Sequence, residues 1–274
     1  ARAMVRDLYE PLTGARVMSL ALSGLAVIAI GGPTLAGALT DLIGGLGALA
    51  LVAAAALAAL AVVAFGLPET VRQRNPRATR PGPLLRNWAA MLGHRVFRAW
   101  ALLIACTYGG LFTILAGSPF VYIEVLGLSS AAFGLTLAWG GAVYLVATFV
   151  GRRWIGRHGM AGTVARGAAF TAAGGLVALF IGLAQPAGTF WWFMAAQALF
   201  SFGHGMHQPC GQAGAVGPFP QAAGAASALA GFILALVAFT IGLWLGVALT
   251  HDGVRTLAFG LAFWSTATAL VAWT

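Results

Sequence analysis

Apolar stretches of about 20 residues recur along the whole chain and constrain its fold more than any other feature. A helix needs about 20 such residues to cross the roughly 30 Å hydrocarbon layer of a bilayer. Backbone polar groups need partners inside lipid, which favours helices, and the short alternating strands of a transmembrane barrel are missing from the sequence. The chain is predicted to be an all-α membrane protein with about eight transmembrane helices. They are expected at residues 17–40, 46–67, 97–118, 130–150, 166–185, 189–212, 222–249 and 255–274.

The composition excludes a water-soluble domain. Apolar residues make up 60% of the 274 residues and charged residues only 8%, whereas soluble domains carry about 25% charged residues. Disorder requires low hydrophobicity and is excluded too. The net charge of +9 would point to nucleic acid in a soluble protein, but here the arginines lie between apolar stretches. The lipid bilayer is therefore the expected partner, and nucleic acid is not. Cys106 and Cys210 read as small buried hydrophobic residues.

The arginines predict the orientation of the chain. Cytoplasmic loops of membrane proteins carry an excess of arginine and lysine. If the predicted helices alternate in direction, every arginine except Arg255 falls on one side of the membrane. The other side carries Asp41, Glu124, Asp252 and Arg255. Both termini are therefore expected to be cytoplasmic.

Residues 68–96 differ from every other connection, because they combine Pro68, Pro76, Pro81 and Pro83 with several arginines. A short amphipathic piece lies around Leu84–Leu92. The segment can be a solvated linker that carries topology charges, or a hinge between two bundles with a helix lying on the membrane, and the two readings are compatible. Three parts are therefore expected: two helices in residues 1–67, the linker 68–96 and a six-helix bundle in residues 97–274.

The first apolar stretch contains a run of small residues around a proline. Small residues let helices approach closely, and a proline bends a helix by freeing a carbonyl. The run is either a packing motif or a hinge on which one bundle rocks against another. Its members are Gly24, Gly31, Gly32, Pro33 and Gly37.

The sixth apolar stretch carries His204 and His207, three residues apart and so on one helix face, with Cys210 close to that face. Such ligands could hold zinc or copper, but no carboxylate lies nearby and Pro209 disturbs the helix, so no metal site is predicted. Polar groups inside a membrane either face a water-filled cavity or pack between helices. The cavity is the preferred interpretation.

Aromatic and polar residues gather on the third and fourth stretches. Tyr108 and Phe112 lie four residues apart on one face and could contact an apolar or aromatic substrate. Core packing or lipid contact is the alternative for each aromatic residue. Tyr122, near a membrane edge, is expected to be an interfacial anchor. The other members of the group are Thr107, Phe133, Trp139 and Tyr144.

The sequence offers no enzyme site. It has no lysine and hence no Walker-type phosphate loop, its six acidic residues are scattered, and its serines lack a His/Asp arrangement. We therefore expect neither catalysis nor a cofactor.

Four short segments stand out by their motifs: residues 2–9, 32–37, 118–128 and 157–162. They resemble drug-efflux transporters of the Bcr/CflA type, which belong to the major facilitator superfamily. Residues 2–9 resemble the segment after their fourth helix, and residues 32–37 are similar to the antiporter motif of their fifth. In that motif Ala36 replaces a glycine, and Ile28 stands where another glycine is usual. Residues 118–128 look like the outer end of their seventh helix, and residues 157–162 like the loop between helices eight and nine.

The resemblance implies that the predicted helices correspond to helices 5–12 of a twelve-helix fold in the bacterial inner membrane. The chain starts at Ala1 and stops at Thr274 within an apolar stretch, so both ends look cut. The family usually keeps its proton-carrying acid in the first four helices, and the chain alone is then expected to be inactive.

The function implied is export of drugs or other amphiphilic molecules by proton antiport. The resemblance and the residue patterns together assign Tyr108, Phe112, Trp139 and His204 to the cavity wall. Gly32, Pro33 and Gly37 belong to the antiporter motif, and Arg6 and Asp7 to cytoplasmic gating contacts.

Two alternatives to drug export stay open. The chain could be a truncated remnant or membrane scaffold that does not transport. It could also be a carrier for a metabolite such as a sugar or an organic anion. A metabolite site would present several charged or hydrogen-bonding groups at mid-membrane, and the apolar stretches hold none of the charged kind.

Overall fold

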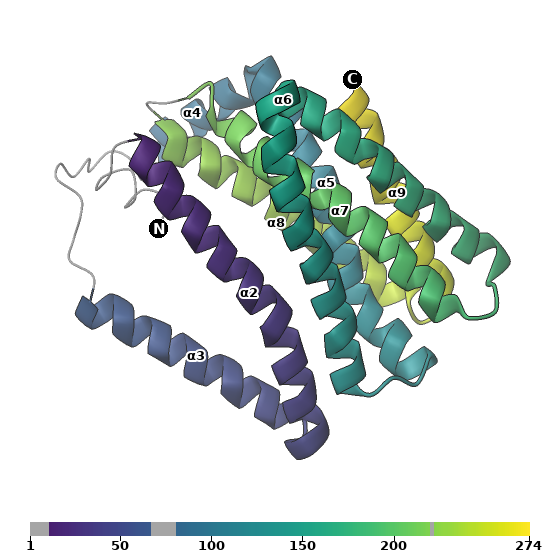
Figure 1. Cartoon of the computed structure of the whole chain (residues 1–274). Helices are drawn as coiled ribbons and strands as arrows, with labels where there is room; N and C mark the ends of the chain where they lie inside the picture. Colours follow the sequence, from purple (N-terminus) through teal and green to yellow (C-terminus); the bar gives the residue numbers. More distant parts are fainter. Residues whose placement is uncertain (1–10, 67–80, 220–221) are drawn as a thin grey trace. The chain divides into compact units, whose positions relative to one another are not determined.

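A computed structural model describes residues 11–66, 81–219 and 222–274, and within these ranges the chain forms helices and no strands (Figure 1). Wherever the structure describes them, the predicted apolar stretches are helical almost to their ends, which confirms the all-α membrane fold. The elements are α2 (Pro11–Ile43), α3 (Gly45–Gly66), α4 (Pro81–Gly93), α5 (Arg95–Pro119), the π-helix η1 (Phe120–Val125), α6 (Ser130–Ala184), α7 (Thr189–Val216), α8 (Ala223–Ala248) and α9 (Gly253–Trp273).

Two of the predicted helices form the two legs of α6. Gly159 has φ 68° and ψ 178°, a left-handed conformation that only glycine adopts without strain, and the chain reverses there. The first leg covers residues 130–158 and the second leg residues 160–184. Arg152, Arg153 and Arg157 lie just before this turn and are exposed.

Five of the described helical segments are long and apolar enough to cross a membrane: Gly45–Gly66, Arg95–Val125, Ser130–Ala184, Ala223–Ala248 and Gly253–Trp273. The 28-residue α7 has the length but carries glutamine and histidine side chains in its middle. Large side chains along one side of α8 are exposed at helical spacing, as expected for a face that contacts lipid. This face contains Phe232, Leu236, Phe239 and Leu243.

The described chain divides into two compact units. The first contains α2, α3 and the first turns of α6, up to Gly141. Here α2 and α3 form a hairpin that turns at Gly44, whose φ is 78° (Figure 1). The start of α6 packs closely on α2, because a Cβ added to Gly37 would collide with the backbone of Ser130. A Cβ on Gly134 would lie 2.5 Å from the carbonyl oxygen of Pro33.

Asp41 caps the first turn of α6 within this unit. Its Oδ1 accepts a hydrogen bond from the Ser130 N–H at 3.0 Å, and its Oδ2 accepts one from the Ala131 N–H at 2.8 Å. The N–H groups of a first helical turn lack partners inside the helix, so a carboxylate there satisfies two of them. The hydrogen bond from the Ala131 backbone lowers the pKa of Asp41 from its ordinary value of 3.8.

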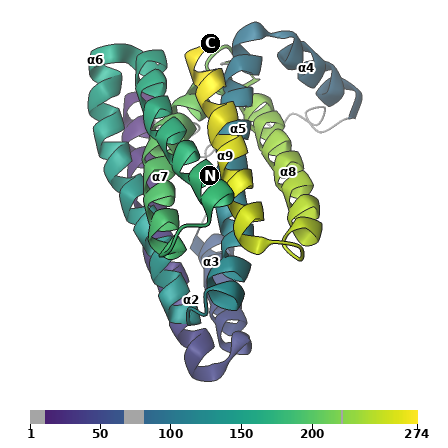
Figure 2. The ribbon, with the colours of Figure 1, turned by 90° about the vertical axis from the view of Figure 1, so that its right-hand side faces the viewer.

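The second unit contains α4, α5, η1, the remainder of α6, and α7 to α9. Figure 2 shows α5 among α7, α8 and α9, and it contacts all three. The segment around Leu84–Leu92 is the helix α4, which packs onto this bundle: Met91 is buried beside Phe97 and Leu229. Trp88 stacks on Phe232 with ring centroids 5.7 Å apart. Residues 68–80, the first part of the predicted linker, lie outside the described ranges, as does residue 67.

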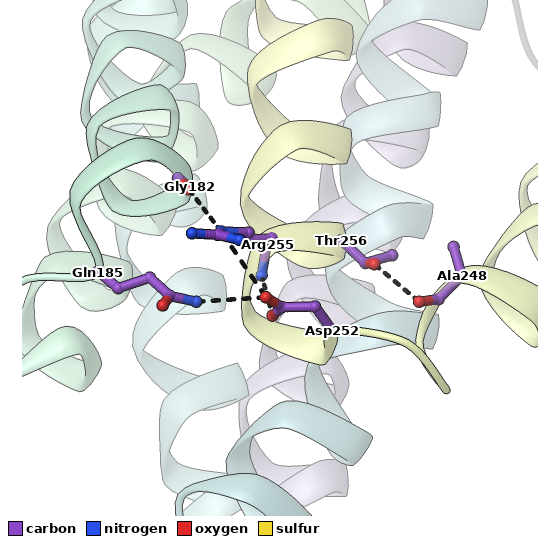
Figure 3. Close-up of polar contacts among 6 residues, drawn as sticks. All are labelled: Gly182, Gln185, Ala248, Asp252, Arg255 and Thr256. Carbon is purple, nitrogen blue, oxygen red and sulfur yellow. Dashed lines mark hydrogen bonds and ion pairs between the residues drawn. The ribbon is translucent and has the colours of Figure 1, made fainter.

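A polar cluster ties the second leg of α6 to the turn between α8 and α9 (Figure 3). Asp252 caps α9 by accepting a hydrogen bond from the Arg255 N–H at 3.0 Å, and its Oδ2 lies 3.7 Å from Arg255 Nε. The Nε of Arg255 donates to the carbonyl of Gly182 at 3.3 Å, and Gln185 donates to Asp252 at 3.4 Å. The hydroxyl of Thr256 donates to the Ala248 carbonyl at 2.9 Å.

The prediction that Tyr122 is an interfacial anchor is wrong. The π-helix η1 follows Pro119 and turns Tyr122 into the bundle, where the side chain is only 2% exposed. Its ring lies 5.9 Å from the rings of Phe190 and Phe193 on α7. A π-helix has a wider turn than an α-helix and so changes which side chains face inward.

Asp41→Asn should lower the thermal stability of the purified protein in detergent near neutral pH by a few degrees. Because the folded-state pKa is lowered, the carboxylate stabilises the fold above about pH 4, and this contribution is lost as the pH falls through the folded value. The melting temperatures of wild type and variant should therefore converge in acid. Glu124→Gln, at an exposed acid on η1, is the matched control. A constant difference between wild type and Asp41→Asn at every pH would contradict the cap.

Candidate functional site

The glycines of residues 203–207 determine how α7 meets its neighbours. A Cβ on Gly203 would collide with Thr171 on the second leg of α6. A Cβ on Gly205 would lie 2.7 Å from the Ala147 Cβ and 2.9 Å from the Tyr144 carbonyl oxygen on the first leg. Small residues allow such backbone approach between membrane helices. His204, between the two glycines, is directed toward α5.

His204 is hydrogen-bonded across to α5. Its Nδ1 lies 2.8 Å from the hydroxyl oxygen of Thr107, and both side chains are buried. Two rings flank the imidazole: that of Phe200, nearly parallel at 5.8 Å, and that of Tyr144 at 5.6 Å. A hydroxyl can donate or accept, so this hydrogen bond is compatible with either imidazole tautomer.

His207, one turn further along α7, has different partners. Its Nε2 lies 3.2 Å from the carbonyl oxygen of Val164 on the second leg of α6. Gly167 leaves room for the ring, because a Cβ there would lie 3.0 Å from that Nε2. His207 is fully buried, and its Nδ1 has no hydrogen-bond partner. We call His204, His207, Thr107 and Tyr144 the histidine junction.

The histidine junction does not have the composition of a metal centre. Cys210, which shares this part of α7, is buried in an apolar cluster with Leu103 and Val164. Within the described ranges, no three His, Cys, Asp or Glu side chains come close enough together to hold a metal ion.

Tyr108 and Phe112 lie on another face of α5. Their ring centroids are 6.2 Å apart, and both side chains are half-buried. On the sides facing other helices, α5 is tightly packed: a Cβ on Gly109 would lie 2.5 Å from the Trp264 ring, and one on Gly110 would lie 2.5 Å from the Phe200 ring. The aromatic pair therefore occupies a looser side of α5 than the faces packed on α7 and α9.

The remaining predicted site residues fall in other places. Trp139 lies on the first leg of α6 in the first unit and is 49% exposed. In the segment predicted to be an antiporter motif, Gly37 lies against Ser130 and the carbonyl of Pro33 lies close to Gly134, whereas a Cβ on Gly32 would meet open space. Arg6 and Asp7 lie outside the described residues.

The structure contains two polar arrangements that the sequence analysis does not predict. The hydrogen bonds from Ser130 and Ala131 to Asp41 join residues about 90 positions apart, and no local sequence pattern predicts them. The cap of α9 by Asp252 did have a signal, an acidic residue directly before an apolar stretch.

Thr107→Val should destabilise the protein more than Thr107→Ser. Valine keeps the shape of threonine but leaves the buried Nδ1 of His204 unpaired, at a cost of about 1–3 kcal/mol. Serine retains the hydroxyl and serves as the matched control. Thermal unfolding in detergent measures both variants, and equal melting temperatures for them would show that the hydrogen bond contributes nothing.

Comparison with known proteins identifies a family and two similar proteins. A family model described as Major Facilitator Superfamily matches residues 1–243. Multidrug resistance protein D of Escherichia coli (strain K12) is 28% identical over 237 residues, which cover 84% of this chain and 57% of that protein. The uncharacterized MFS-type transporter YdgK of Bacillus subtilis (strain 168) is 28% identical over 98 residues, or 36% of this chain and 23% of that protein.

The chain thus spans between about a quarter and little more than half of these relatives' length. The family match covers most of the sequence, and the helical, lipid-compatible architecture agrees with it. The chain belongs to the Major Facilitator Superfamily, a family of multi-pass membrane transporters.

Proposed function

We propose that the native protein carrying this chain exports drug-like amphiphilic molecules in exchange for protons. Family membership supports a small-molecule transporter, and the similarity to multidrug resistance protein D over 84% of the chain supports drugs as the substrate class. In this proposal the protein lies in a bacterial inner membrane with both termini in the cytoplasm, as the arginine distribution favours.

The observation that carries the proposal is the aromatic face of α5. Tyr108 and Phe112 form a half-buried pair near the middle of a 25-residue helix, where a ligand would meet ring faces. Sites for small molecules are mostly apolar and aromatic, with few polar groups. The described acids Asp41, Glu124 and Asp252 all lie near helix ends, so no described carboxylate marks a mid-membrane site for a charged metabolite.

We also propose roles for the other predicted site residues. Trp139 and His204 are proposed to belong to the cavity wall as well, and the rings of Tyr144 and Phe200 flank the imidazole of His204. Arg6 and Asp7 are proposed to make the cytoplasmic gating contacts.

The antiporter motif is proposed to act where α2 meets the start of α6. Gly37 and Gly134 bring two backbones together without intervening side chains, so small rotations of one helix are felt directly by the other. Pro33 lies inside the continuous helix α2 and removes one helical hydrogen bond there.

Transport by the native protein in proteoliposomes tests the proposal. With an imposed proton gradient, tetraphenylphosphonium and chloramphenicol should move against their concentration gradients, and lactose and citrate should not. Collapse of the gradient with a protonophore should abolish accumulation. Movement of lactose or citrate alone would favour a metabolite carrier, and movement of none of the four would favour a non-transporting protein.

Pro33→Leu should reduce proton-driven efflux several-fold while leaving the amount of protein in the membrane unchanged. Leucine restores the missing backbone N–H and so straightens the helix where we propose that it must bend. Leu42→Phe, at an exposed position on the same helix but outside residues 32–37, is the matched control. Efflux by Pro33→Leu at the wild-type rate would refute the hinge.

A further inference from the structure

We propose that His204 and His207 form one proton-binding site at the middle of the second unit, and that the site binds and releases a single proton during transport. This inference rests on the proposed function, because it assigns part of the proton exchange to two named side chains. It adds a site within the chain to the acid that the resemblance expects in the first helices of the family.

His207 offers a basic nitrogen ready for a proton. Its Nε2 faces the carbonyl oxygen of Val164 at 3.2 Å, and a carbonyl only accepts, so this nitrogen carries the hydrogen. In the neutral ring the other nitrogen, Nδ1, is then an unprotonated acceptor. It is buried and receives no hydrogen bond. Unpartnered buried polar atoms are rare in folded proteins and call for an explanation.

His204 can share the charge. Its hydrogen bond to Thr107 survives a change of protonation, because the hydroxyl can rotate from donor to acceptor. The rings of Phe200 and Tyr144 lie within 6 Å of the imidazole, and aromatic faces attract a cation. The two histidines are one helical turn apart, so a charge on one opposes a charge on the other and the pair holds one proton.

Among the described residues, the titratable groups near the pair carry no negative charge that would balance an imidazolium. Tyr144 on the first leg of α6 and Cys210 on α7 are neutral at ordinary pH, and α5 presents the hydroxyl of Thr107. Arg166, next to Gly167 on the second leg, is exposed and donates to the Gly162 carbonyl at 2.9 Å. On α9, Asp252 and Arg255 pair at the helix start, away from the histidine junction.

The depth of the pair suits a transmembrane proton site, as the position of its hydrogen-bonding partner Thr107 on α5 shows. Thr107 lies halfway along α5, about 18 Å from either end at 1.5 Å per residue, in a layer about 30 Å thick. Ionisable groups at such a depth mark proton and substrate pathways in membrane proteins.

The step is a proton transfer with simple balance. A proton from water on one side forms an N–H bond at Nδ1 of His207 or on His204, giving one imidazolium. The same bond breaks when the proton leaves to water on the other side. In the described conformation Nδ1 has no acceptor within reach for a new N–H, so uptake requires an opening that admits water. Thr107 then transmits the change to α5, where Tyr108 is the next residue.

Nitrogen NMR of histidine-labelled native protein in lipid nanodiscs tests proton binding directly. His204→Gln and His207→Gln identify the two imidazoles by the signals that disappear. As the pH is lowered from about 9, which is well above the ordinary histidine value of about 6.5, the pair should take up one proton in total before the protein unfolds. If both rings stay neutral throughout, or if each takes up a full proton, the proposal is overturned.

Proton release on drug binding tests the role in transport. Tetraphenylphosphonium added to weakly buffered protein in detergent should release about one proton fewer from the His204→Gln/His207→Gln double variant than from wild type. His251→Gln, at an exposed histidine after α8, is the control and should release as much as wild type. Equal release from the double variant would overturn the coupling role.

The two proposals fail in different ways. Wild-type protein that transports none of the probes and releases no proton would refute proton-coupled drug export, while the NMR titration would still decide whether the pair binds a proton. Wild-type protein that exports drug, together with a double variant that releases as many protons as wild type, would refute the role of the histidine site alone.

Discussion

Close backbone contact at glycines is the constraint on which the described helices depend. In lipid there is no hydrophobic force to press one helix against another, so association relies on close packing and on hydrogen bonds between helices. Gly203 and Gly205 let α7 touch both legs of α6, and Gly110 admits the Phe200 ring against α5. Because of this close packing, His204 lies within hydrogen-bonding distance of Thr107, and His207 within hydrogen-bonding distance of Val164. A methyl group at any of these glycines would push the helices apart. Buried polar side chains would then lose hydrogen-bonding partners that lipid cannot replace.

The helices could be predicted from the sequence because their signal is local. An apolar stretch of sufficient length has few alternatives in a membrane, and a described helix covers each predicted stretch to within a residue or so of its ends. Arginines interrupt the apolar pattern between residues 150 and 166 and predict a break there, and the chain reverses within this interval, at Gly159. The pairing of Tyr108 with Phe112 also follows from helical spacing alone.

The contacts between helices could not be predicted, because they depend on which faces meet. Spacing placed His204 and His207 on one face of α7, yet one bonds to α5 and the other to α6. The sequence shows Asp41 only as a charge at one edge of the membrane, whereas in the fold its carboxylate accepts hydrogen bonds from the first turn of a helix about 90 residues later. A tyrosine near the end of an apolar stretch is typical of an interfacial anchor, whereas Tyr122 lies on the π-helix after Pro119 and is buried in the bundle.

That π-helix has a consequence for how related chains should be compared. A π turn holds about one residue more than the α turn that it replaces, and one residue corresponds to about 100° of rotation. A chain with a plain α-helix over Phe120–Val125 could keep the equivalent of Tyr122 against Phe190 and Phe193 only by being one residue shorter. A single-residue gap in an alignment at this place would then mark a change of helix type, with the same side chain buried on both sides of the gap.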